Sequence, residues 1–144
     1  MIPIKSERDL RVMRKSCEIA ATVLDKISKL AVAGVSTWDL NEAAKRLMDQ
    51  YHCRSAAYKY KCGSLKYPCH VCISVNDQVI HGIASKDVIL KDSDIVSIDC
   101  ATIYQGFVGD NTRTVYIGEP TPEVRKLVEA TAESLRLGID KARP

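Results

Sequence analysis

Two aspartates inside a long β-hairpin pattern constrain the fold of this chain more than any other feature. Residues 95–104 form a run of mostly β-prone residues, Gln105-Gly106 breaks the run, and residues 107–117 resume it. The pattern predicts two long antiparallel strands joined by a tight turn. Asp99 lies in the first strand and Asp110 in the second, although charged carboxylates are rarely buried unless they are paired or bind a metal.

The numbering places both aspartates on one face of this hairpin. With Gln105-Gly106 as the turn, Asp99 faces Thr112; with the turn one residue earlier, Asp99 faces Asp110 directly. Either register makes the carboxylates neighbours that repel each other unless a cation lies between them. Hard divalent cations suit such an oxygen-rich site. In the alternative interpretation both carboxylates cap turns or pair with Arg113.

Three segments have the periodicity of amphipathic helices. The first begins with a capping pair, Ser6 and Asp9, and ends before Gly34. The second begins near Ser36 or Thr37. The third has Thr121-Pro122 as N-cap and first helical residue. Their apolar stripes are, in chain order, Leu10, Met13, Cys17, Ala20, Leu24, Ile27 and Ala31; Leu40, Ala43, Ala44, Leu47 and Tyr51; and Val124, Leu127, Val128, Thr131, Leu135 and Ile139.

Shorter β-prone stretches lie between the second helix and the hairpin. Residues 56–61 and 71–76 are predicted strands, and residues 79–81 are predicted to return after a turn at Asn76-Asp77. Neither a linker nor a repeat interrupts the chain. We therefore expect one α/β unit over residues 1–144, with antiparallel hairpins packed against helices.

Composition excludes several classes of protein. A net charge of +3 is too small to indicate a nucleic-acid or membrane surface. The sequence has neither a secretory signal nor an apolar run long enough to span a bilayer. We therefore expect a cytoplasmic protein, with no direct nucleic-acid site, whose cysteines are thiols. Cys53, Cys62, Cys69 and Cys72 leave open a zinc-stabilised binding module, although they include a single C-x-x-C pair.

The segments around the aspartates resemble the type I methionine aminopeptidase family. The resemblance is carried by residues 67–83 (YPCHVCISVNDQVIHGI), by residues 90–99 and by residues 106–114 (GFVGDNTRT), and it extends over the whole chain. It implies a pita-bread fold, in which two similar halves enclose a dinuclear metal centre and this chain is the N-terminal half. For the full-length protein it implies removal of the initiator methionine from nascent proteins by a metal-activated water.

The same resemblance implies roles for individual residues. The aspartate matching Asp99 binds one metal, and the one matching Asp110 bridges both. The histidine matching His81 is catalytic and contacts the substrate, while residues matching Tyr67 and Cys72 line the pocket for the methionine side chain. The implied metals are two divalent ions, with Co, Mn, Fe and Zn all suitable.

The resemblance also implies partners and leaves alternatives open. Nascent polypeptide N-termini are the implied partners, with the ribosome as a further candidate, and a monovalent cation near Asn76 is a weaker implication. No histidine follows His81, so the His and Glu ligands that complete the family's centre are missing, and we expect the 144-residue chain alone to be inactive. The alternatives are a pseudopeptidase binding module of the same fold and a prolidase-like metallopeptidase.

Overall fold

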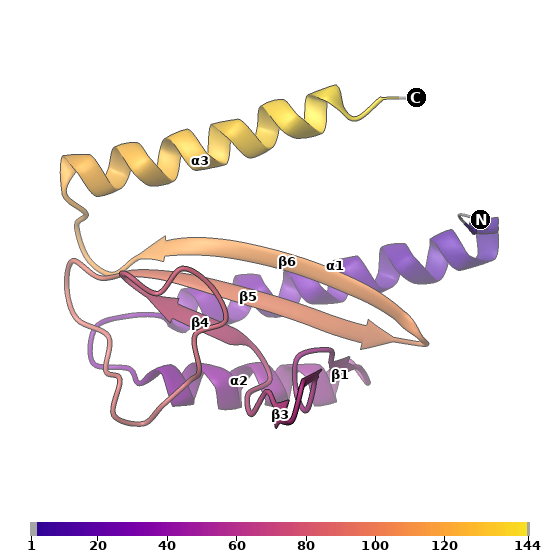
Figure 1. Ribbon diagram of the computed structural model, residues 1–144, viewed down its shortest axis with the longest axis horizontal. Coiled ribbons are helices and arrows are strands. Elements are labelled where there is room, and N and C mark those ends of the chain that lie inside the picture. Colours follow the sequence, from indigo (N-terminus) through magenta and orange to yellow (C-terminus); the bar gives the residue numbers. More distant parts are fainter. Residues whose placement is uncertain (1–2, 144) are drawn as a thin grey trace.

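A computed structural model describes residues 3–143, apart from the side chain of Cys62. It is a mixed α/β structure around one antiparallel sheet (Figure 1). None of the described helices is long and apolar enough to cross a membrane. The elements are α1 (Glu7–Leu30), α2 (Thr37–Gln50), β1 (Arg54–Ser55), β2 (Lys61–Cys62), β3 (Leu65–Lys66), β4 (Cys72–Val75), β5 (Ile95–Tyr104), β6 (Phe107–Tyr116) and α3 (Pro122–Lys141).

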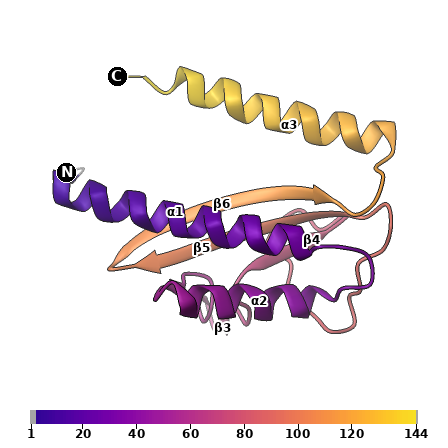
Figure 2. The same ribbon diagram turned by 180° about the vertical axis from the view of Figure 1, so that it is seen from behind.

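Strand β5 organises the sheet. It pairs along its whole length with β6 on one side, and on its other side it pairs with β4 and, further along, with β1. Helix α1 packs on β5 and β6, and α2 packs on α1 and β1, so both helices cover one face of the sheet (Figure 2). Val96, Ile98 and Cys100 are buried against this helical layer. The odd-numbered residues of β5, Asp99 among them, face the other way.

Helix α1 approaches β6 very closely at one point. A Cβ at Gly109 would overlap the backbone of Ser16, and the Ser16 hydroxyl donates to the carbonyl of Phe107 at 2.9 Å. Ser16 is therefore buried while Cys17 is exposed. The predicted apolar stripe of this helix was wrong at Cys17, because the small Ser16 lets the helix lie closer to the sheet than a large side chain would.

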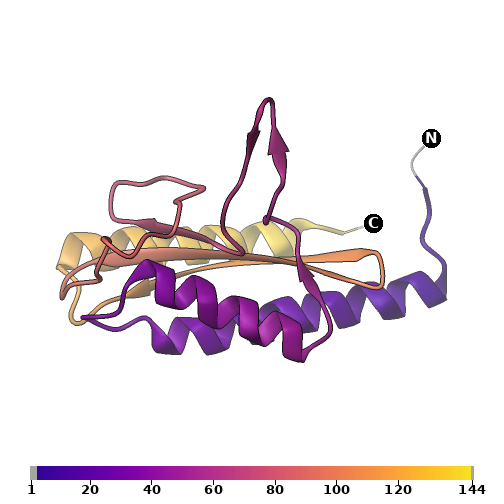
Figure 3. The same cartoon turned by 90° about the horizontal axis from the view of Figure 1, so that it is seen from below.

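The predicted capping pair of α1, the predicted start of α2 and the strand at 71–76 are confirmed, but two short strands are not. Ser6 and Ser36 each form a capping box, with Asp9 and Asp39. Residues 79–81 are not a strand, and of residues 56–61 only Lys61 belongs to one. The chain turns after β1 because the Ser55 hydroxyl accepts hydrogen bonds from the backbone amides of residues 57 and 58. The β2–β3 hairpin then projects from the face opposite α1 and α2 (Figure 3).

Helix α3 lies apart from the helical layer (Figure 1). It begins as predicted, with Thr121 as N-cap and Pro122 in the first turn, but it has no buried residue. Leu127 is 61% exposed and Ile139 is 64% exposed. Its apolar stripe is thus mostly exposed among the described residues, with Val124 and Val128 half-buried. One unit over residues 1–144 stays a prediction.

Candidate metal centre

The turn of the β5–β6 hairpin fixes the register of the two aspartates. Gln105 and Gly106 both have positive φ, +47° and +86°, as a two-residue type I′ turn requires. Asp99 therefore pairs with Thr112, and Asp110 pairs with Ala101, which lies two residues after Asp99 in β5. The alternative register, with the turn one residue earlier, was wrong because Gly106 supplies the left-handed conformation that the second turn position needs.

The two carboxylates interact on the outer face of the hairpin. Asp99 is half-buried and Asp110 is exposed. The pKa of Asp99 is raised, first by burial, then by the charge of Asp110 and by a hydrogen bond shared with it. A hydrogen bond from Thr112 and the charge of His81 act in the opposite direction. Sequence reasoning gave Thr112 no role, although the Gln105-Gly106 register already placed it opposite Asp99.

Arg113 does not neutralise this pair. Its guanidinium contacts the Asp25 carboxylate of α1 at 3.1 Å. Within residues 3–143, neither Asp99 nor Asp110 forms an ion pair with a basic side chain. The alternative in which Arg113 pairs with them was therefore wrong. Two adjacent carboxylates without a protein cation form a donor set that fits divalent metal ions.

Cys72 and Tyr67 lie beside Asp99. Cys72 is directly opposite Asp99 in the β4–β5 ladder and is buried. Burial raises the pKa of its thiol, and a hydrogen bond with Tyr67 partly offsets the shift. The Tyr67 hydroxyl donates to the carbonyl of Gly82 at 2.7 Å, and its pKa is raised, chiefly by burial. Both groups are therefore neutral at neutral pH.

His81 precedes a glycine that is fixed against β4. The amide of Ile73 donates to the carbonyl of Gly82 at 2.9 Å, and the amide of Gly82 donates to the Ser74 hydroxyl at 3.0 Å. A Cβ at Gly82 would overlap the backbone of Ile73, so this approach requires glycine. His81 itself is exposed, with a φ of +58°. Its charge has a smaller effect on the pKa of Asp99 than burial, Asp110 or Thr112, so a position beside the carboxylate pair stays a prediction.

The remaining predicted sites lie elsewhere. Asn76 braces the start of β5: its amide group donates to Asp94 at 2.8 Å, and its oxygen accepts from the amide of residue 95 at 3.0 Å. Of the four cysteines considered for a zinc site, Cys53 follows α2 and lines a cavity at the end of that helix, whereas Cys72 lies opposite Asp99. Among the described side chains, no three or more His, Cys, Asp or Glu residues gather as a metal site.

Comparison with known proteins decides the family. The model of metallopeptidase family M24 matches residues 11–144. The chain belongs to metallopeptidase family M24. It is 40% identical over 145 residues to the methionine aminopeptidase of Aquifex aeolicus, covering 99% of this chain and 56% of that protein. For the methionine aminopeptidase of Clostridium acetobutylicum the identity is 39%, over 99% of this chain and 55% of that protein.

Solved structures of other proteins share the fold. The methionine aminopeptidase of Thermotoga maritima matches with a TM-score of 0.94 and 31% identity, over 100% of this chain and 56% of that one. A prolidase from Pyrococcus horikoshii matches with a TM-score of 0.81 and 24% identity, over 98% of this chain and 38% of that one, which supports the fold alone. The expected pita-bread fold is thus confirmed, and the chain spans about half the length of the curated relatives it matches.

Proposed function

We propose that the full-length protein carrying this chain removes the N-terminal methionine from nascent polypeptides with the help of divalent metal ions. The observation that carries the proposal is the unpaired carboxylate pair of Asp99 and Asp110 on the outer face of the hairpin. The relatives named methionine aminopeptidase support it. A pseudopeptidase would have no reason to keep both carboxylates unpaired at the cost of mutual repulsion.

Asp99 and Asp110 would hold the metals. Asp99 is half-buried and oriented by Thr112, while Asp110 is exposed and free to reach a second ion. When bound, divalent ions supply an activated water and polarise a carbonyl group. Two carboxylates are few for ions that prefer about six ligands, so the 144-residue chain alone should bind metal weakly, and its inactivity stays a prediction.

Tyr67, Cys72 and His81 would handle the substrate. The neutral Tyr67 and Cys72 groups give the face beside Asp99 an apolar wall, which suits a thioether side chain. His81 is exposed, and beside the metals it would donate a hydrogen bond to the carbonyl group under attack. Gly82 fixes the position of the histidine relative to β4.

The location and partners follow from the proposed reaction. Initiator methionine is removed where proteins are made, so we place the protein in the cytoplasm, with the ribosome as a candidate partner. Mn, Fe, Co and Zn all suit carboxylate and imidazole ligands. A monovalent cation near Asn76 has little support from its side chain, since both polar atoms of that side chain already bond to other residues.

Asp110→Asn tests the carboxylate pair. The substitution keeps the size of the side chain and removes a negative charge, so methionine release from a short peptide should fall by more than about a hundredfold, the upper end for residues that only support a metal ligand. The assay is run on the full-length protein with added Mn. Asp140→Asn, on the exposed α3, is the matched control and should keep the parental rate. An Asp110→Asn variant that remained fully active would overturn the proposal.

His81→Ala tests the histidine. Because His81 is exposed and outside the core, the variant should keep the parental unfolding midpoint while turnover falls by about a hundredfold or more. Steady-state kinetics and urea unfolding of the same preparation separate these effects. Loss of stability, or an unchanged rate, would instead assign His81 a structural role or none.

A further inference from the structure

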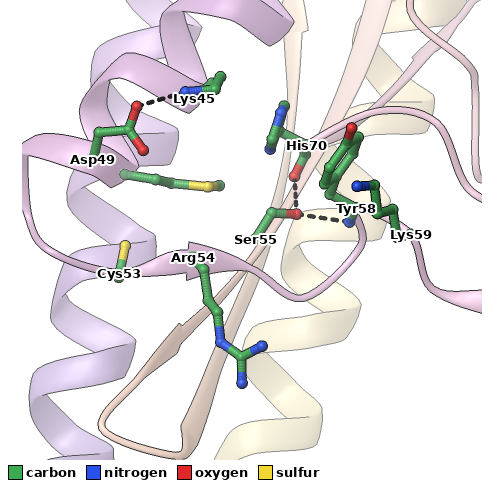
Figure 4. A pocket seen from close by; sticks show the side chains of 9 residues that line it. Lys45, Asp49, Cys53, Arg54, Ser55, Tyr58, Lys59 and His70 are labelled. Carbon is green, nitrogen blue, oxygen red and sulfur yellow. Dashed lines mark hydrogen bonds and ion pairs between the residues drawn. The ribbon is translucent and has the colours of Figure 1, made fainter.

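A cavity of about 490 Å³ opens on the α2 side of the sheet edge (Figure 4). Its walls come from the end of α2, from β1 and the loop after it, and from His70. None of the residues assigned to the candidate metal centre lines it. Its size is in the range of pockets that hold one small ligand or one nucleobase.

Two stacked rings form one side of the cavity. The rings of Tyr58 and His70 lie 4.4 Å apart between centroids, at 19° to each other. One hydroxyl anchors both: Ser55 donates to the carbonyl of His70 at 2.7 Å and accepts from the amide of Tyr58 at 2.9 Å. The amide of His70 donates to the side chain of the buried Asn41 at 2.7 Å. The stacked pair is therefore preorganised by contacts outside the cavity.

The imidazole of this pair is uncharged at neutral pH. The pKa of His70 is lowered, first by burial and then by the positive charge of Lys45. A neutral ring stacks on a base without the cost of removing a charge from water. The stacked pair thus has the properties of an aromatic platform.

Basic side chains line the cavity that holds the platform. Lys45, Arg54 and Lys59 line the cavity, and its one carboxylate, Asp49, is already paired with Lys45 at 2.7 Å. The Lys59 ammonium lies 5.0 Å from the centroid of the Tyr58 ring.

The charge continues along the chain beyond the cavity. No aspartate or glutamate occurs between Asp49 and Asp77. Lys61 and Lys66 lie on the β2–β3 hairpin, which projects from the sheet (Figure 3), and Tyr60 before it is 67% exposed. Tyrosines and lysines therefore alternate from the cavity to the base of the hairpin, over Tyr58-Lys59-Tyr60-Lys61.

We propose that the cavity and the β2–β3 hairpin form a binding surface for single-stranded nucleic acid. One unpaired base stacks on the His70 ring from the cavity side, since the faces of the Tyr58 ring are covered by His70 and by the Lys59 ammonium. The neighbouring phosphates lie along Arg54, Lys59 and Lys61. Basic grooves with interleaved aromatic rings bind single strands in this way. The sequence expectation of no nucleic-acid site rested on the net charge of +3, which averages over the acid-free stretch between Asp49 and Asp77.

An acidic peptide fits the surface less well. It would use the cations but would gain nothing from a preorganised ring pair, and a duplex would keep its bases out of reach of the cavity. The affinity for a single strand should therefore exceed the affinities for an acidic peptide and for a duplex.

Fluorescence anisotropy with a labelled octa-adenylate RNA tests the surface on the purified protein. Tyr58→Leu keeps an apolar side chain and removes the ring, so affinity should fall about tenfold or more. The double variant Lys59→Gln/Lys61→Gln should reduce the slope of log affinity against log salt by about 1.4, the effect of two phosphate contacts on a single strand. The control Lys126→Gln/Lys141→Gln removes the same charge from α3 and should change neither quantity.

The outcomes that overturn the proposal are distinct. They are no binding by the parent at low salt, equal affinity for the duplex of the same sequence, equal affinity for polyglutamate, and an equal loss in the α3 control. The duplex and polyglutamate comparisons use the unaltered protein, so they remain decisive even if Tyr58→Leu fails to fold. Unchanged circular dichroism and unfolding midpoints check the lysine variants.

Discussion

The β5–β6 hairpin and helix α3 have equally clear sequence patterns, but only the hairpin contributes buried residues to the core. Val96, Ile98 and Cys100 of β5 are fully enclosed by the helical layer, whereas α3 has no buried residue. The apolar stripe of α3 is as regular as that of α1. Periodicity therefore tells which face of an element is suited to burial, but not which surface covers it.

The largest effect is expected from a methyl group at the helix–hairpin contact. In Gly109→Ala the new Cβ would overlap the Ser16 backbone, and backbone cannot give way as a side chain can, so the free energy of unfolding should fall by about 4 kcal/mol or more. Gly138→Ala on α3 meets no atom within 4 Å and should stabilise the helix by up to about 1 kcal/mol. Urea unfolding of both variants measures the contrast. Equal effects at the two sites would contradict the close packing of α1 on β6.

Removing one apolar side chain from each region gives a smaller contrast. Ile98 is 0% exposed, so Ile98→Ala should cost about 3 kcal/mol from lost burial and the cavity left behind. Leu127 on α3 is 61% exposed, and Leu127→Ala should change stability by less than about 0.5 kcal/mol. Thermal and urea unfolding of the 144-residue chain decide the matter. A large loss from Leu127→Ala would mean that the stripe of α3 is covered in solution, for instance by a second copy.

The smallest effect is expected at the carboxylate pair on the outer face of the hairpin, where a substitution should raise the free energy of unfolding instead of lowering it. The pKa of Asp99 in the folded protein is above its ordinary value of 3.8. Its carboxyl group therefore contributes stability that is complete below that value and is lost as the pH rises through the raised pKa. At neutral pH without metal, Asp99→Asn should raise the free energy of unfolding by about 1 kcal/mol or less, because the pair is half exposed to solvent.

The measurement is urea unfolding at acidic and neutral pH, with chelator and with excess Mn. The gain from Asp99→Asn should disappear at acidic pH, and Mn should stabilise the parent more than the variant. Asp140→Asn on α3 serves as the control: it removes an exposed partner of Arg136 and should change stability only slightly at either pH. A destabilised Asp99→Asn variant would show that the carboxylate pair does not strain the metal-free fold.

Local sequence was sufficient to predict the elements whose ends are fixed by neighbouring residues. The structure contains, as predicted, the capping pair of α1, the start of α2 near Ser36, the Thr121-Pro122 start of α3 and the strands flanking Gln105-Gly106. Each rests on interactions within a few residues. Residues 56–61 and 79–81 were predicted wrongly, because a short β-prone stretch becomes a strand only if another strand is placed to pair with it.

The sequence by itself determined that Asp99 and Asp110 share a face, since strand alternation fixes that parity in either register. The tertiary structure decided the rest of the site. It placed Cys72 opposite Asp99 and left Arg113 to Asp25. Parity is a property of one hairpin and can be counted along the chain, whereas these contacts join segments distant in sequence and depend on how the sheet and its helical layer pack together.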